Sequence, residues 1–194
     1  MINQFFKLTS LVALGFVAPI ANAGQFVTEL NAPLKAISDD LLSSHKVELD
    51  QSFSAGEDSY AVFTANDKVS LMSFFQRAEI HVEKVAEVLF INTPTLSGGQ
   101  PAAEEPRIGH QVYIIERPIP GVGFFGLDKK KKISRGSNNA IAKLGEIIEW
   151  DQSYLTSEGT YCVYRADSPE TLREHGALAG APVGKITAVD QTKF

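Results

Sequence analysis

Five side chains in the C-terminal half are of types that can bind or react with a small ligand. They are an indole, two phenols, a thiol and an imidazole, at Trp150, Tyr154, Tyr164, Cys162 and His175. A thiolate and an imidazole together suit a soft or borderline metal such as nickel, copper or zinc. The same pair could instead make an activated cysteine nucleophile. Ordinary core packing, with the imidazole satisfied by a hydrogen bond, is the third interpretation.

The predicted elements place His175 more firmly than Cys162. His175 follows Leu172 by three positions and precedes Ala179 by four, so on a helix it shares their face toward the sheet. Cys162 lies on the preceding predicted strand, on the same face as Tyr164, and both faces of that strand are apolar. If this face meets the helices, Cys162 and His175 could approach one another.

Two further candidates come from neighbouring predicted strands. The alternation of residues 147–155 places Trp150 and Tyr154 on one face, where they could line a pocket or pack in the core. Glu116 ends a central strand over 110–117, where burial would demand a partner. An ion pair in the core is the alternative to a binding role for this carboxylate.

Motifs of known enzyme classes are missing from the sequence. It has no glycine-rich phosphate loop, no His-Glu-x-x-His, no Gly-x-Ser-x-Gly and no paired-cysteine metal motif. Cys162 is the only cysteine, so no internal disulfide can form. These absences weigh against an enzyme and favour a binding module.

The chain matches itself without a gap when it is shifted by 101 positions. Between residues 47–88 and 148–189, 13 of 42 aligned positions are identical. A repeat of this length indicates a tandem duplication of a small domain. At the five candidate positions the first copy carries hydrocarbon side chains, namely Leu49, Phe53, Phe63, Ala61 and Phe74. We therefore expect any site in residues 110–192, with the first copy as a degenerate partner.

Each copy is expected to have the order strand, helix, strand, strand, helix, strand. The predicted ranges are 26–30, 33–45, 47–54, 60–65, 68–78 and 82–92, then 110–117, 128–144, 147–155, 160–166, 169–178 and 185–191. This order predicts an α+β fold of two ferredoxin-like βαββαβ units, 24–92 and 110–194, joined by an extended linker, 93–109. The bare sheet faces would pack together as an intramolecular pseudo-dimer.

The N-terminus and the composition limit the cell compartment and the partners. Lys7, an apolar run and Ala21-Asn22-Ala23 form the pattern of a cleaved secretory signal over residues 1–23. We expect a secreted protein, in a bacterial periplasm, with no membrane span after cleavage. Cleavage removes Lys7 and takes the net charge from −5 to −6, which argues against nucleic acid. The one basic run, 129–132, is interpreted as a solvated helix face.

Several motifs of the second copy resemble a known bacterial family. They are Ile115-Glu-Arg-Pro-Ile-Pro-Gly121, Glu149-Trp-Asp-Gln-Ser-Tyr154, Tyr161-Cys-Val-Tyr164 and Arg173-Glu-His175. The sequence from about 110 to 192 resembles small domains of unknown function described as nickel-binding-protein-like. The resemblance implies a ferredoxin-like fold that pairs into dimeric α+β barrels, and nickel as a candidate ligand. Cys162, His175 and Glu116 are the matched positions with ligand-capable chemistry.

These observations predict a secreted binding or sensor module with one pocket in its C-terminal half. The partner would be a small organic molecule or a transition metal ion, and the protein would be a monomeric pseudo-dimer or a homodimer. The alternative is a small-molecule enzyme that uses His175 and Glu116 in a cavity between the sheets, which rests on fold-level analogy.

Overall fold

The computed structural model describes residues 23–194, and in them two similar halves follow one another. The expected signal segment, apart from Ala23, lies outside the described residues. In the described part of the chain, no helix is long and apolar enough to cross a membrane. The first half contains β1 (Gly24–Leu30), α1 (Asp39–His45), β2 (Val47–Ser54), β3 (Ser59–Ala65), α2 (Lys68–Arg77) and β4 (Val82–Glu87). The second half contains β6 (Gln111–Arg117), α3 (Leu127–Leu144), β7 (Ile148–Leu155), β8 (Thr160–Ala166), α4 (Pro169–Ala179) and β9 (Ile186–Lys193).

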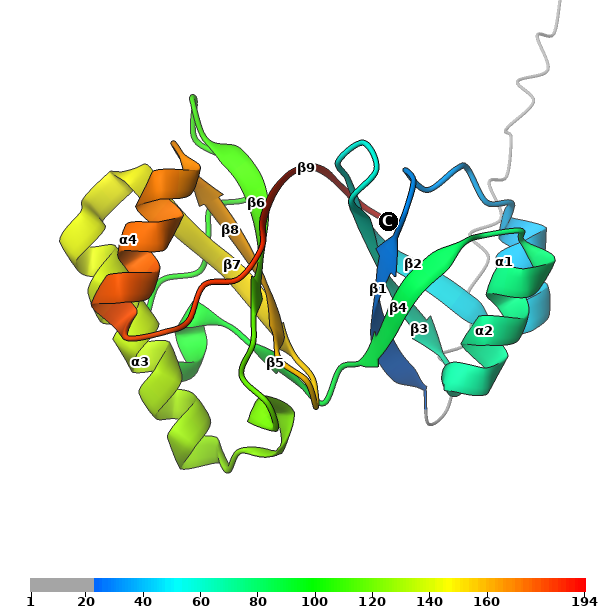
Figure 1. The fold of residues 1–194 in the computed structure, drawn as a ribbon, viewed down its shortest axis with the longest axis horizontal. Coiled ribbons are helices and arrows are strands. Elements are labelled where there is room, and N and C mark those ends of the chain that lie inside the picture. The colour runs from blue at the N-terminus through cyan, green and yellow to red at the C-terminus, as the bar shows by residue number, and fades with distance from the viewer. Residues whose placement is uncertain (1–22) are drawn as a thin grey trace, which may run out of the picture.

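The strands form one antiparallel sheet that closes on itself. Its order is β4-β1-β3-β2-β9-β6-β8-β7-β5, where β5 (Phe90–Asn92) follows β4 after two residues. The last strand of each half therefore continues into the other half: β9 pairs with β2, and the chain leaving β4 pairs with β7 as β5. Figure 1 shows these two crossings at opposite ends of the molecule, with the helices outside. The predicted α+β fold with two ferredoxin-like units is confirmed.

Three apolar cores follow from this arrangement. Both halves contribute to the core between the two sheet halves, which contains Phe53, Tyr60, Tyr154 and Tyr161. A second core lies between the first sheet half and α1 and α2, and a third between the second sheet half and α3 and α4. Since strand side chains alternate between faces, every central strand contributes to an inner and an outer core.

A β-bulge corrects one sequence prediction. The register of β7 against β8 shifts between Trp150 and Gln152, so Asp151 is the extra residue and the alternation reverses there. Trp150 consequently packs in the outer core under the helices, whereas Tyr154 lies in the core between the sheet halves. The prediction that both rings share one face is wrong. The first half has the same shift, at Asp50.

The first half and the linker also differ from their predicted elements. The predicted helix over 33–45 forms only from Asp39, because the Ser38 side chain caps the helix there by accepting a hydrogen bond from the Leu41 amide. The predicted strand 82–92 is interrupted at residues 88–89, where the chain passes from one half to the other. In the predicted linker, η1 (Pro94–Ser97) is held by Asn138 of α3, which donates to the Pro94 carbonyl at 2.9 Å.

Candidate functional site

A cavity lies in the second half, between the outer face of the sheet and the helices α3 and α4. It has a volume of about 750 Å³. Four of the five candidate side chains line it, namely Trp150, Cys162, Tyr164 and His175. The rest of the wall is mainly apolar and includes Ile133, Leu155 and a proline-rich segment from β6 toward α3. The second half therefore brings four of the five candidate side chains together in one pocket. Tyr154 lies outside this pocket.

Three phenylalanine rings occupy much of the corresponding space of the first half, where a smaller pocket of about 410 Å³ remains beside α1 and the end of α2. Phe63, Phe74 and Phe75 pack with ring centroids 5.1 to 6.0 Å apart. In the shift of 101 positions, Phe75 corresponds to Gly176. A Cβ at Gly176 would collide with Val183, so no side chain from this position can fill the second half in the same way. The cavity of the second copy is thus larger, and the Phe75 ring has no counterpart there.

A chain of buried polar groups runs along one wall of the cavity. Arg117 Nη2 lies 3.4 Å from His175 Nδ1, and His175 Nε2 lies 3.0 Å from Ser137 Oγ. Ser137 Oγ is in turn 2.9 Å from the Tyr164 hydroxyl. Because a guanidinium can only donate, Nδ1 must accept, and the ring proton of the neutral imidazole is therefore on Nε2. Burial raises the pKa of Tyr164, so its hydroxyl stays protonated in this chain.

The buried imidazole makes folding depend on pH. Burial, and after it the positive charge of Arg117, lower the pKa of His175 from 6.5 to about 4. Between these values the unfolded chain takes up a proton at His175 and the folded protein does not, so stability is full above pH 6.5 and falls as the pH falls toward 4. At pH 5 we expect this residue to lower the free energy of unfolding by about 2 kcal/mol relative to pH 7.5. Urea unfolding of wild type and of His175→Gln at both pH values measures the difference; an equal pH dependence in the two proteins contradicts the assignment.

Cys162 lies on the helix side of β8, which the sequence left open. Its sulfur is 3.0 Å from Thr160 Oγ1, while both nitrogens of His175 have other partners. Among residues 23–194 no group of three or more His, Cys, Asp or Glu side chains could hold a metal ion. The wall also carries four basic side chains, Arg117 and three lysines, and no carboxylate. Cys162 and His175 are the soft and borderline metal donors of this wall, and the Cys162–His175 metal site stays a prediction.

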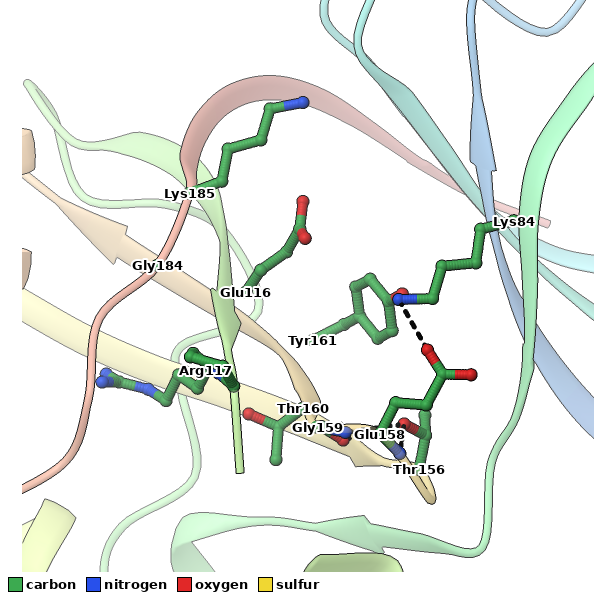
Figure 2. A pocket seen from close by; sticks show the side chains of 11 residues that line it. Lys84, Glu116, Arg117, Thr156, Glu158, Gly159, Thr160, Tyr161, Gly184 and Lys185 are labelled. Atoms are coloured by element: carbon green, nitrogen blue, oxygen red, sulfur yellow. Dashed lines mark hydrogen bonds and ion pairs between the residues drawn. The ribbon is translucent and has the colours of Figure 1, made fainter. Parts of the chain in front are cut away.

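Glu116 and His175 lie on opposite faces of the second sheet half. Glu116 points into the space between the two halves, beside Lys185 and Tyr161, as Figure 2 shows. His175 belongs to α4 and lines the outer cavity. The enzyme alternative assumed one cavity between the sheets that contains both residues. This prediction is wrong, because His175 lies outside that space. The core between the halves is packed, and the pocket beside Glu116, of about 270 Å³, lies at its edge.

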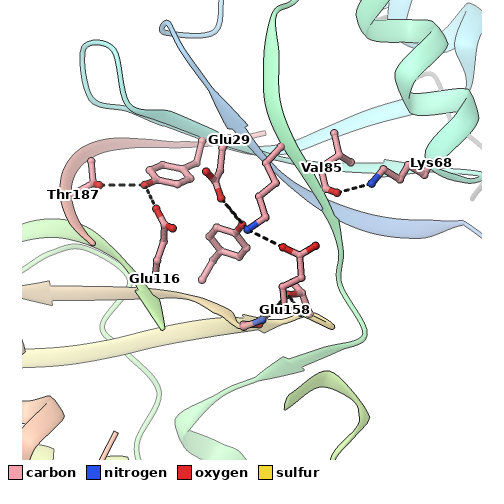
Figure 3. A network of polar contacts seen from close by, with 11 residues as sticks. Glu29, Lys68, Val85, Glu116, Glu158 and Thr187 are labelled. Carbon is pink, nitrogen blue, oxygen red and sulfur yellow. Dashed lines mark hydrogen bonds and ion pairs between the residues drawn. The ribbon is translucent and has the colours of Figure 1, made fainter. Parts of the chain in front are cut away.

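Two tyrosines between the halves form crossed hydrogen bonds that the sequence reasoning missed. Tyr60 of the first half donates to Glu116 of the second at 2.7 Å, and Tyr161 of the second donates to Glu29 of the first. Thr187 also meets the Tyr60 hydroxyl, at 3.2 Å (Figure 3). Burial raises the pKa of both tyrosines, so both hydroxyls remain donors. The sequence signal for this pair is the identity of Tyr60 and Tyr161 in the aligned copies.

The fold and the cavity define a closed α+β barrel of two ferredoxin-like repeats, with a pocket under the helices of the second. Residues 113–189 match the model of a family described as nickel responsive protein SCO4226-like. The second repeat thus matches a nickel-responsive family, which confirms the resemblance seen in its motifs. None of the curated proteins matches the chain.

Solved structures with similar folds are distant in sequence. A mutant chlorite dismutase from Candidatus Nitrospira defluvii is 8% identical, with 87% of this chain and 91% of that chain covered and a TM-score of 0.45. A putative monooxygenase from Lactobacillus acidophilus NCFM is 10% identical, with 88% and 94% covered and a TM-score of 0.39. Likeness at this level says nothing about activity.

Proposed function

We propose that the protein is a binding module for a small organic molecule, which it holds in the cavity between the second sheet half, α3 and α4. The observation that carries the proposal is the difference between the two repeats. The first repeat packs Phe63, Phe74 and Phe75 under its helices and keeps a pocket of about 410 Å³, whereas the second keeps about 750 Å³ open and lines it with polar groups. A mainly apolar wall with a few convergent polar groups, here Arg117, His175 and Ser137, is typical of small-molecule sites.

Filling the cavity from two directions tests this function. Cys162→Phe places a ring in the cavity from β8, and Ile133→Trp does so from α3. Each variant is expected to abolish the fluorescence enhancement of N-phenyl-1-naphthylamine, a neutral aromatic probe, that the wild type produces. Val69→Phe on the outer surface of α2 is the matched control, since Val69 is 79% exposed and outside the cavity. Circular dichroism confirms folding; unchanged probe binding in both folded cavity variants would refute the proposal.

Nickel is the second candidate ligand, and the family match of residues 113–189 favours it. Calorimetric titration of wild type and a Cys162→Ala/His175→Ala double variant with nickel chloride separates the possibilities. Loss of nickel binding in the double variant would support the predicted ligands. Equal weak binding by both proteins would remove these two side chains as ligands. Secretion through residues 1–23 remains part of the proposal, and N-terminal sequencing of the exported protein tests it.

A further inference from the structure

Two buried cations line the cavity without an anionic partner. Lys130 is 8% exposed and Arg117 is 5% exposed, and both belong to the wall. No ion pair within 4.0 Å involves either residue in the part of the chain that the structure describes. Buried charges are ordinarily paired, because removal from water costs several kcal/mol per ion. Lys130 and Arg117 therefore depart from the usual pairing of buried charges.

The partners that the two cations do have are neutral. Lys130 Nζ donates to the Gly123 carbonyl at 2.9 Å and lies 4.3 Å from the centre of the Phe90 ring. Arg117 Nη1 donates to the Pro182 carbonyl at 2.8 Å, and its other terminal nitrogen meets the neutral His175. These contacts hold the side chains in place and leave both positive charges uncompensated.

The same fold pairs its other buried arginine in the usual way. Arg165 is 2% exposed, and its terminal nitrogens lie 3.8 Å from Glu149 and 4.0 Å from Asp151. Arg117 has a carboxylate as its chain neighbour, but Figure 2 shows its side chain turned away from Glu116 and Glu158. Charge compensation is thus missing at the cavity in particular, which is the place where a ligand could supply it.

We propose that the natural ligand of the cavity is an organic anion with an apolar body, such as a carboxylate, sulfonate or phosphate ester of an aromatic or aliphatic molecule. Lys130 and Ser137, the residue linked to Arg117 through His175, are seven positions apart on α3, or roughly 10 Å along the helix. The two charges therefore mark separate levels of the wall. An anionic group at either level is bound, and the apolar body lies against Trp150 and Tyr164. This inference rests on the proposed small-molecule function and specifies its ligand.

A pair of probes that differ in one anionic group tests the inference. 8-Anilinonaphthalene-1-sulfonate carries a sulfonate on the ring system of N-phenyl-1-naphthylamine, and fluorescence titration gives the affinity of each for the full chain. We expect the wild type to bind the sulfonate roughly ten- to a hundredfold more tightly. Lys130→Met and Arg117→Met should each reduce this preference, while Lys143→Met, an exposed lysine of the same helix outside the cavity, should keep it.

Thermal unfolding without probe distinguishes a binding role of Lys130 from a structural one. If the lysine were needed for folding, its replacement would lower the unfolding midpoint. Since Lys130→Met removes an unpaired buried charge and keeps the volume, its midpoint should equal or exceed that of wild type. Equal affinity of wild type for both probes, or a preference unchanged in both methionine variants, overturns the anion inference and leaves the proposed cavity function standing. If neither probe responds to Cys162→Phe and Ile133→Trp, the cavity function fails, and the inference fails with it.

Discussion

Replacing Phe75 with alanine is expected to lower the free energy of unfolding by about 3 to 5 kcal/mol. Phe75 is fully buried, and its ring lies 5.1 Å from Phe63 and 5.7 Å from Phe74, measured between centroids. Removing it deletes apolar contacts and leaves a void that closely packed neighbours fill only in part. Denaturation by urea, followed by far-ultraviolet circular dichroism, measures the loss.

Val69→Ala is the matched control for Phe75→Ala. Both residues belong to α2, but Val69 is 79% exposed, so its truncation should change stability by less than about 0.5 kcal/mol. A loss of under 1 kcal/mol for Phe75→Ala would mean that the first repeat is loosely packed. The difference in packing under the helices of the two repeats would then disappear.

Removing the hydroxyls of Tyr60 and Tyr161 together is expected to lower the free energy of unfolding by about 3 to 6 kcal/mol. Each phenol donates to a carboxylate of the other repeat, and a hydrogen bond to a charged group contributes about 1.5 to 3 kcal/mol. The Tyr60→Phe/Tyr161→Phe variant keeps both rings, so the loss reports the polar contacts between the repeats. Urea unfolding of the double variant and of each single variant gives the values.

Tyr113→Phe provides the control for the two tyrosine replacements. Tyr113 is buried on β6, and its hydroxyl makes no hydrogen bond within residues 23–194, so its removal should be close to neutral. If the double variant is as stable as Tyr113→Phe, the crossed pairs do not hold the repeats together. The packed apolar core between the halves would then be sufficient for their association.

The sequence predicts the duplication and most of the elements, because both repeats keep the same buried pattern. Val62 and Val163 face the inner core, while Ala65 and Ala166 face the outer ones. The bulge at Asp151 was not predictable from the alternation of apolar and polar residues. Both faces of this strand are largely buried, so a one-residue shift does not stand out in the sequence. For that reason Tyr154 was placed on the wrong face.

The sequence predicted the aromatic, thiol and imidazole side chains of the candidate site. It did not predict the two buried cations of the wall. The basic run 129–132 was interpreted as a solvated face, yet four consecutive helical residues point in four directions roughly 100° apart. One of them, Lys130, is consequently buried in the cavity wall, whereas Lys129 and Lys132 reach the wall from exposed positions. Arg117 was not predicted as a site residue, because Glu116 at the end of the same strand indicated an ion pair in the core. Within residues 23–194 the structure shows no such ion pair for either residue. Only the packing of the helices on the sheet reveals which cations lack a counterion.

A crystal structure of the full chain with bound 8-anilinonaphthalene-1-sulfonate is the decisive measurement for the cavity under α3 and α4 as a ligand site. We expect electron density for the naphthalene ring against Trp150 and Tyr164, with the sulfonate within hydrogen-bonding distance of Lys130 or Arg117. Density for the probe only on the outer surface or between the two sheet halves, with the space under α3 and α4 closed by side chains, would contradict it.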